Sequence, residues 1–124
     1  MLRLKRHEFV DMVLRCYEDL PPQIMDYLEN VDVVVEDWPA GDVLDSQQME
    51  SRHDLLGSYT GVSRLERGGE LPMLPDKITI YQRPLESICA TLEDLEREVR
   101  KTLLHEVGHY LGLDEEALHR LGYE

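Results

Sequence analysis

The 124-residue sequence has few cysteines and no long apolar run, and each shortage excludes a class of protein. Cys16 and Cys89 lie far apart and form no Cys-x-x-Cys pair, so neither a disulfide framework nor a cysteine zinc site is indicated. We expect both to be reduced thiols in the core. Residues 1–8 include basic residues without a following apolar segment, and no stretch approaches membrane-spanning length. We therefore expect a cytoplasmic protein with no membrane partner.

Basic residues are also scarce, because 13 Lys and Arg stand against 26 Asp and Glu, a formal net charge of −13 at pH 7. Nucleic-acid binding depends on clustered Lys and Arg that release counterions from phosphates, so the composition argues against a nucleic-acid partner. Solubility alone explains an acidic surface equally well, so the charge does not identify a partner. The length predicts a single domain, residues 1–124, with one modest core and no separate substrate domain.

The most informative stretch that is present is His-Glu-Val-Gly-His at residues 105–109. Two histidines four positions apart on a helix lie one turn above each other, with Cβ atoms roughly 5–6 Å apart. His105 and His109 can therefore bind one ion. Glu106 lies beside the first histidine, where a carboxylate can take a proton from metal-bound water and later pass it to a leaving group. This motif on a helix is typical of zinc metalloproteases.

A catalytic zinc site needs three protein ligands and an open position, and one helix face supplies only two. Gly112 can end the helix, because glycine accepts the left-handed conformation found there, and an acidic run at residues 114–116 follows. Asp114 and Glu115 are both candidates for the third ligand. The same residues also suit the N-cap and first turn of a further helix over residues 114–121. His53 is a more distant alternative, although its polar surroundings favour a surface histidine over a ligand.

The rest of the chain predicts a scaffold for this helix. Apolar spacing indicates a helix over about residues 6–19, and Pro21-Pro22 separates it from a second, short helix. β-branched or alternating segments predict strands at 31–36, 55–63 and 77–81, with the first central or nearly so. A polar stretch, 43–54, contains a possible helical turn. A loop over 64–75 could rim a substrate groove.

The motif helix should begin at the capping sequence Thr91-Leu92-Glu93-Asp94 and run to about residue 111. His105 and His109 fall on the flank of its apolar stripe, and Glu106 lies at the edge of that stripe. Within the predicted strands, Gly61 indicates a bulge or a close backbone approach. Tyr59 and Tyr81 are either hydrogen-bond donors to a reaction intermediate or aromatic residues packed on a sheet face. The stripe itself consists of Leu92, Leu95, Val99, Leu103, Val107 and Tyr110.

Taken together, these segments resemble the small bacterial zincin-like metallopeptidase family, whose members are sometimes called minimal zincins. The resemblance runs through most of the chain, in residues 20–22, 30–37, 56–62, 74–81 and 105–112. It implies an α+β fold with a small mixed sheet of three to four strands packed with helices, and a metal-binding helix near the C-terminus. It also implies a motif of the type H-E-x-x-H-x-x-G-x-x-D, one Zn²⁺ per chain, and a peptide or protein substrate.

Carried over to this sequence, the family pattern makes His105 and His109 ligands and Glu106 the general base. Gly112 becomes the turn after the helix, and Glu115 occupies the position of the family's aspartate. This departure leaves the third ligand open, and we rank Glu115 first and Asp114 second. The family brings no defined substrate, and the oligomeric state is equally open.

Three functions follow as hypotheses. The first is a zinc-dependent hydrolase of peptide bonds, in which an edge strand at residues 78–81 could hold an extended peptide by strand addition. The second is a binding or regulatory module in which zinc clamps the helix to the C-terminal segment without turnover. The third compares the motif with metal-dependent RNA endonucleases of the type H-G-x-x-H-x-x-G-x-D-H. Gly112 and Asp114 fit that pattern, whereas Glu106, Glu115 and the acidic charge do not.

Overall fold

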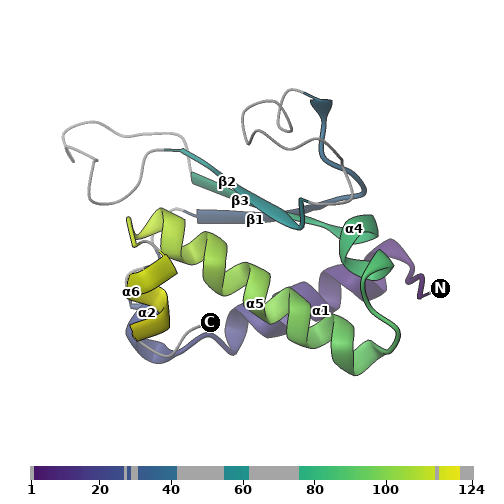
Figure 1. The fold of residues 1–124 in the computed structure, drawn as a ribbon, viewed down its shortest axis with the longest axis horizontal. Coiled ribbons are helices and arrows are strands. Elements are labelled where there is room, and N and C mark those ends of the chain that lie inside the picture. Colours follow the sequence, from purple (N-terminus) through teal and green to yellow (C-terminus); the bar gives the residue numbers. More distant parts are fainter. Residues whose placement is uncertain are drawn as a thin grey trace.

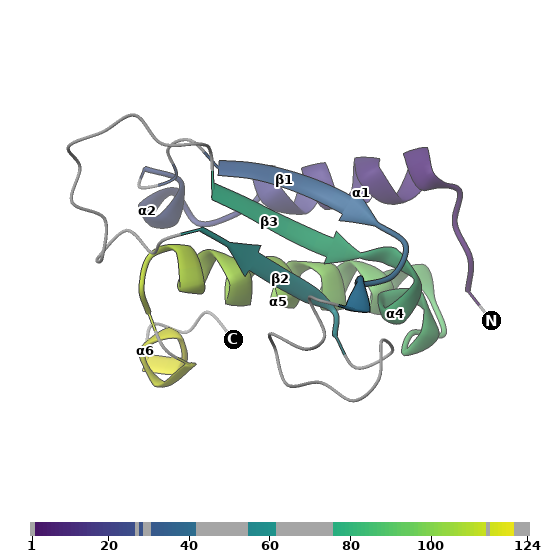
Figure 2. The ribbon, with the colours of Figure 1, turned by 90° about the horizontal axis from the view of Figure 1, so that it is seen from above.

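Helix α5 (Leu92–Tyr110) lies along one face of a three-stranded sheet, and α1 (Arg6–Glu18) lies beside it in the same layer (Figures 1 and 2). The computed structural model describes residues 2–26, 28, 31–41, 55–61, 76–113 and 115–120. No helix within these ranges has both the length and the apolar character needed to cross a bilayer. The other elements are α2 (Pro22–Met25), β1 (Val31–Glu36), β2 (Gly57–Thr60), β3 (Asp76–Tyr81), α4 (Gln82–Ser87) and α6 (Glu115–Arg120).

The strand order is β1-β3-β2, with β1 parallel and β2 antiparallel to β3. This mixed sheet with its helical layer confirms the expected α+β class. The prediction that the first strand is central was wrong, because β3 pairs on both sides. For the same reason, residues 78–81 cannot serve as an edge for strand addition. Burial explains the order, since β3 is buried at every position except Lys77, whereas no residue of β1 is fully buried.

The core lies between the sheet and the two long helices. Phe9, Val13, Ile80, Leu95 and Val99 are each at most 1 % exposed. Burying an aliphatic or aromatic side chain of this size stabilises a fold by about 1.5–3 kcal/mol relative to leaving it exposed. The helix over 6–19 is therefore confirmed as scaffold, one residue shorter than expected. These contacts fix α5 against the sheet, and α5 carries the motif.

Both cysteines lie in this core as free thiols. Burial raises the pKa of the Cys16 thiol and that of the Cys89 thiol. A raised thiol pKa keeps the nucleophilic thiolate scarce at neutral pH, so both residues act as small apolar side chains. This agrees with the expectation of reduced core thiols.

The two ends of α5 follow local sequence signals. At the start, the Thr91 hydroxyl accepts a hydrogen bond from the Asp94 backbone N–H at 3.1 Å, which confirms the predicted N-cap. At the end, Gly112 has φ of 78°, and the Leu113 N–H donates to the Gly108 carbonyl at 2.8 Å. This is a Schellman motif, so Gly112 ends the helix as expected. Leu92 was expected in the core but is 56 % exposed, because it is the first residue of the helix.

Candidate metal centre

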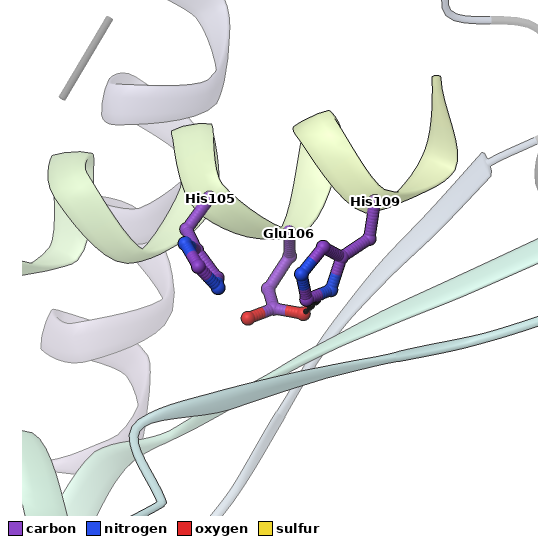
Figure 3. A group of neighbouring side chains, drawn as sticks. All are labelled: His105, Glu106 and His109. Carbon is purple, nitrogen blue, oxygen red and sulfur yellow. Dashed lines mark ion pairs between the residues drawn. The ribbon is translucent and has the colours of Figure 1, made fainter. Parts of the chain in front are cut away.

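Three side chains from the last turns of α5 form the candidate site. His105, Glu106 and His109 extend from the helix toward the strands of the sheet (Figure 3). Their potential ligand atoms all lie within 4.8 Å of one another, a separation at which a single metal ion could be bound. The two imidazole rings have centroids 4.6 Å apart and an interplanar angle of 65°. The helical spacing of four residues therefore brings both histidines to one point, as the sequence predicted.

Glu106 is the buried member of this group. The residue is only 5 % exposed, whereas the His109 side chain is 43 % exposed. Its Oε1 lies 3.2 Å from Nδ1 of His109, the one polar contact that the described part of the chain gives this carboxylate. A buried carboxylate is costly unless it is paired or serves a reaction. The site thus holds a largely buried carboxylate beside two side chains whose nitrogen atoms are potential metal ligands.

Gly57 at the start of β2 allows the strand to approach Glu106 closely. A Cβ atom at this position would lie 2.7 Å from Cγ2 of Thr102, 3.2 Å from the Thr79 carbonyl oxygen and 3.4 Å from Cγ of Glu106. Only glycine fits without a shift of strand or helix. The close approach at Gly57 was not predicted from the sequence, although a glycine inside a strand pattern is the usual signal of such an approach. The sequence predicted a bulge or close approach at Gly61 instead, and that prediction also holds, because Gly61 has φ of 141° just after β2 and a Cβ there would clash with the Asp76 carboxylate.

A groove of about 350 Å³ opens between the start of β2 and α5, and both His105 and Glu106 line it. The candidate metal centre is therefore continuous with a space that a ligand can enter. Protein sites for small ligands typically have volumes of ~300–1,000 Å³. This groove is at the lower limit of that range, which suits part of a ligand better than a whole one.

The two tyrosines considered as donors to an intermediate both contact other side chains of the fold. Tyr81 is 2 % exposed, and its hydroxyl lies 3.0 Å from the hydroxyl of Ser58 in a buried hydrogen bond. The Tyr59 ring packs edge-on against Tyr110 of α5, with centroids 6.2 Å apart. The described contacts support aromatic packing for Tyr59, whereas for Tyr81 they show a buried side chain whose hydroxyl is hydrogen-bonded to Ser58.

The side chains considered for the third ligand lie outside the described part of the chain. Asp114 and His53 are not among the described residues, and neither is the side chain of Glu115. The backbone of Glu115 begins α6, which contacts α5 after the turn at Gly112. The ranking of Glu115 before Asp114 therefore stays a prediction. The stretches 43–54 and 64–75 and the end of the second predicted strand also lie outside the described residues.

Comparisons with known proteins agree with this geometry. A family model described as "zincin-like metallopeptidase" matches residues 28–123. Among solved structures, the chain is similar to a conserved hypothetical protein from Thermo thermophilus, with 26 % sequence identity and a TM-score of 0.54. That match covers 87 % of this chain and 94 % of the other. No curated protein matches the chain significantly.

Proposed function

The chain belongs to the zincin-like metallopeptidase family, and we propose that it is a zinc-dependent hydrolase of peptide bonds. One observation supports this most strongly: the buried Glu106 carboxylate lies near the imidazoles of His105 and His109, and Glu106 and His105 line an open groove. A site that only stabilised the fold would not require its carboxylate to border such a groove.

The donor set suits zinc, because His nitrogen atoms and carboxylate oxygen atoms are its usual ligands in hydrolases. His105 and His109 would hold the ion, and we propose Glu115 as the third ligand with Asp114 as the alternative. When bound, zinc polarises a scissile carbonyl and makes a coordinated water more acidic. Glu106 accepts a proton from the attacking water and transfers it to the leaving nitrogen. Water is thereby added across the amide, and the products are a carboxylate and an amine.

The position of β2 favours it as the strand that orients a peptide. It is an outer strand of the described sheet, and at its first residue, Gly57, the strand passes so close to Glu106 that an added Cβ would lie 3.4 Å from Cγ of Glu106. An extended peptide that pairs with the outer edge of β2 would gain main-chain hydrogen bonds and would run beside the groove. Strand addition is thus proposed at β2, in place of the central strand β3.

The metal site is tested first by elemental analysis of tag-free protein. We expect about one zinc per chain in the wild type, and its loss in His109→Ala. His7→Ala is the matched control, because His7 is an exposed histidine of α1 outside the site. If wild type and control also fail to bind zinc when it is offered, the proposed site is wrong.

Activity is tested separately with the zinc-loaded protein on a broad peptide library. Hydrolysis that disappears with a chelator and returns with zinc would support the proposal. Zinc bound at one per chain without any hydrolysis would instead favour the non-catalytic binding module, in which the metal stabilises the packing of α5. A fall in thermal stability with chelator would then be the main effect of the metal.

A further inference from the structure

The groove at the candidate metal centre has two kinds of wall. Leu55 and Leu56 line it from the segment that leads into β2. On the opposite side, α5 contributes Glu98, Lys101 and Thr102, followed by the site residues His105 and Glu106. Because a helix rises ~1.5 Å per residue, the stretch of α5 from residue 98 to 105 spans roughly 10 Å. The groove therefore extends away from the reactive end, along the helix.

The inner part of this groove is apolar. Leu55 is 5 % exposed and does not belong to the main core cluster, while Leu56 is partly buried against that cluster. Thr102 is buried, and its hydroxyl donates to the Glu98 carbonyl at 2.8 Å, so its single donor is used within the helix. A polar side chain that entered here would lose water and would find no free side-chain donor on Leu55, Leu56 or Thr102.

The outer part of the groove is charged but balanced. The Lys101 ammonium lies 3.9 Å from the Glu98 carboxylate, and their side chains are 53 % and 29 % exposed. Opposite charges this close offset each other, so the pair gives no strong preference for a charged side chain of either sign. The pair lies on α5 ahead of Thr102, on the side of the groove that faces away from His105.

We propose that this groove binds an apolar side chain, such as Leu, Met or Phe, of the substrate residue next to the scissile bond. The proposal rests on the proposed function, because the reacting bond is placed by Glu106. The groove is lined by Glu106 itself, and one side chain reaches the leucine walls from a bond held there. The substrate class is then peptides with an aliphatic or aromatic residue at the cleavage point, and Leu56 contributes to specificity.

The first arm of the experiment measures cleavage. Capped hexapeptides with an alanine background carry one Leu, Phe, Gly or Lys, and mass spectrometry identifies the bond that zinc-loaded protein cleaves. We expect cleavage beside Leu or Phe, with kcat/KM at least about tenfold above the Gly and Lys peptides, the discrimination usual for apolar pockets.

The second arm changes the groove. Leu56→Ser should lower kcat/KM for the Leu peptide at least about tenfold while leaving the Gly peptide nearly unchanged. Leu14→Ser is the matched control, because Leu14 lies on α1 and is 45 % exposed. Both variants are compared at equal zinc content and with intact circular dichroism, so that a loss of fold is not mistaken for a loss of specificity.

The third arm measures binding without turnover, by fluorescence anisotropy of labelled Leu and Gly peptides with zinc-loaded Glu106→Gln. Tighter binding of the Leu peptide, removed by adding Leu56→Ser, supports the groove assignment. Cleavage without preference for apolar residues overturns it and leaves the proposed function standing. Leu-selective binding with no cleavage by wild type upholds the groove but contradicts the hydrolase. If neither cleavage nor selective binding occurs, both proposals are wrong.

Discussion

Two buried glutamates, Glu86 on α4 and Glu106 on α5, differ in how many hydrogen-bond partners surround their carboxylates. Glu86 is 2 % exposed, and its carboxylate accepts three hydrogen bonds. The donors are the Leu4 backbone N–H at 2.7 Å, Nε2 of Gln82 at 3.1 Å and Nη1 of Arg83 at 2.7 Å. Glu106 is 5 % exposed, and among the described residues its carboxylate has one polar contact, to His109.

The number of donors separates a structural carboxylate from one that is available for chemistry. A buried charge with its hydrogen-bonding capacity filled holds neighbouring segments together, and losing it is costly. A buried carboxylate with a single partner and an open groove beside it keeps capacity to accept a proton from a ligand. Burial alone therefore does not distinguish the two roles, whereas the number of hydrogen-bond donors around the carboxylate does.

Glu86 belongs to a polar network that ties the segment before α1 to α4 and to the end of β1. The Gln82 amide donates to the Leu4 carbonyl at 2.9 Å, and Arg6 Nε donates to Gln82 Oε1 at 3.0 Å. Arg6 also donates to the Val35 carbonyl at 3.1 Å. None of these groups lines the groove at the metal centre. The network can thus be changed without touching the site, which makes the comparison testable.

The largest expected effect is on turnover in Glu106→Gln. Removing a general base typically lowers the rate by ~10²–10⁴-fold, and glutamine keeps the shape of the side chain. We expect zinc content and unfolding free energy to stay close to wild type, because the carboxylate has only one polar contact among the described residues. The measurements are kcat/KM, elemental analysis and urea unfolding. Turnover equal to wild type would remove Glu106 from the mechanism.

The next effect is on stability, in Glu86→Gln. The new amide NH₂ must face either Arg83 or the Leu4 N–H, and both are donors, so one hydrogen bond is replaced by a repulsive contact. Breaking a buried charged pair of this kind costs about 2–3 kcal/mol. Urea unfolding measures this loss, and kcat/KM should not change at temperatures where the variant is folded. Glu36→Gln, at an exposed position of β1, is the control. A Glu86→Gln variant that is as stable as wild type but has reduced turnover would contradict the structural role of Glu86.

A smaller effect is expected at the contact between β2 and α5, in Gly57→Ala. The added methyl group would meet Thr102 Cγ2 at 2.7 Å, and overpacking of this kind costs about 1–2 kcal/mol. Thr102→Ser removes that methyl contact and keeps the hydroxyl, so the double variant should regain part of the stability and turnover. Gly41→Ala is the control, because a Cβ there would meet nothing within 4 Å. Equal losses in the single and double variants would contradict this origin of the strain.

The elements that the sequence predicted well are those that depend on local spacing. The Thr91 cap, the Gly112 turn and the convergence of His105 and His109 all follow from positions a few residues apart on one helix. Neighbouring residues on a helix have fixed relative positions, so no knowledge of the rest of the fold is needed. The family resemblance then supplied the α+β class, which the structure confirms.

The elements that the sequence did not predict depend on long-range packing. The Val-rich strand β1 looked central, but strand order is set by which strand can be covered on both sides, and β3 takes that place. The burial of Glu106 results from the approach of β2, which Gly57 permits from far away in the sequence. Leu92 satisfied the helical period yet lies beyond the core. Periodicity gives the face of a helix, but it does not tell how far the core extends.

The smallest expected effect is at the exposed edge of the Glu86 network, in Asp37→Asn. The Arg6 guanidinium donates to Asp37 Oδ1 at 2.6 Å, and this hydrogen bond is the main reason why the pKa of Asp37 is lowered. A lowered pKa in the folded state means that the unfolded state binds more protons as the solution is acidified. The contribution is therefore complete above the unfolded pKa of roughly 4 and is lost as the pH falls through the folded value. The Asp37 side chain is 50 % exposed, so solvent screening limits the contribution to about 0.5 kcal/mol. Urea unfolding of Asp37→Asn and wild type should differ at pH 7 and converge well below pH 4. A difference that persists in acid would show that Asp37 acts through the shape of its side chain, and the ion pair with Arg6 would then add nothing to the network around Glu86.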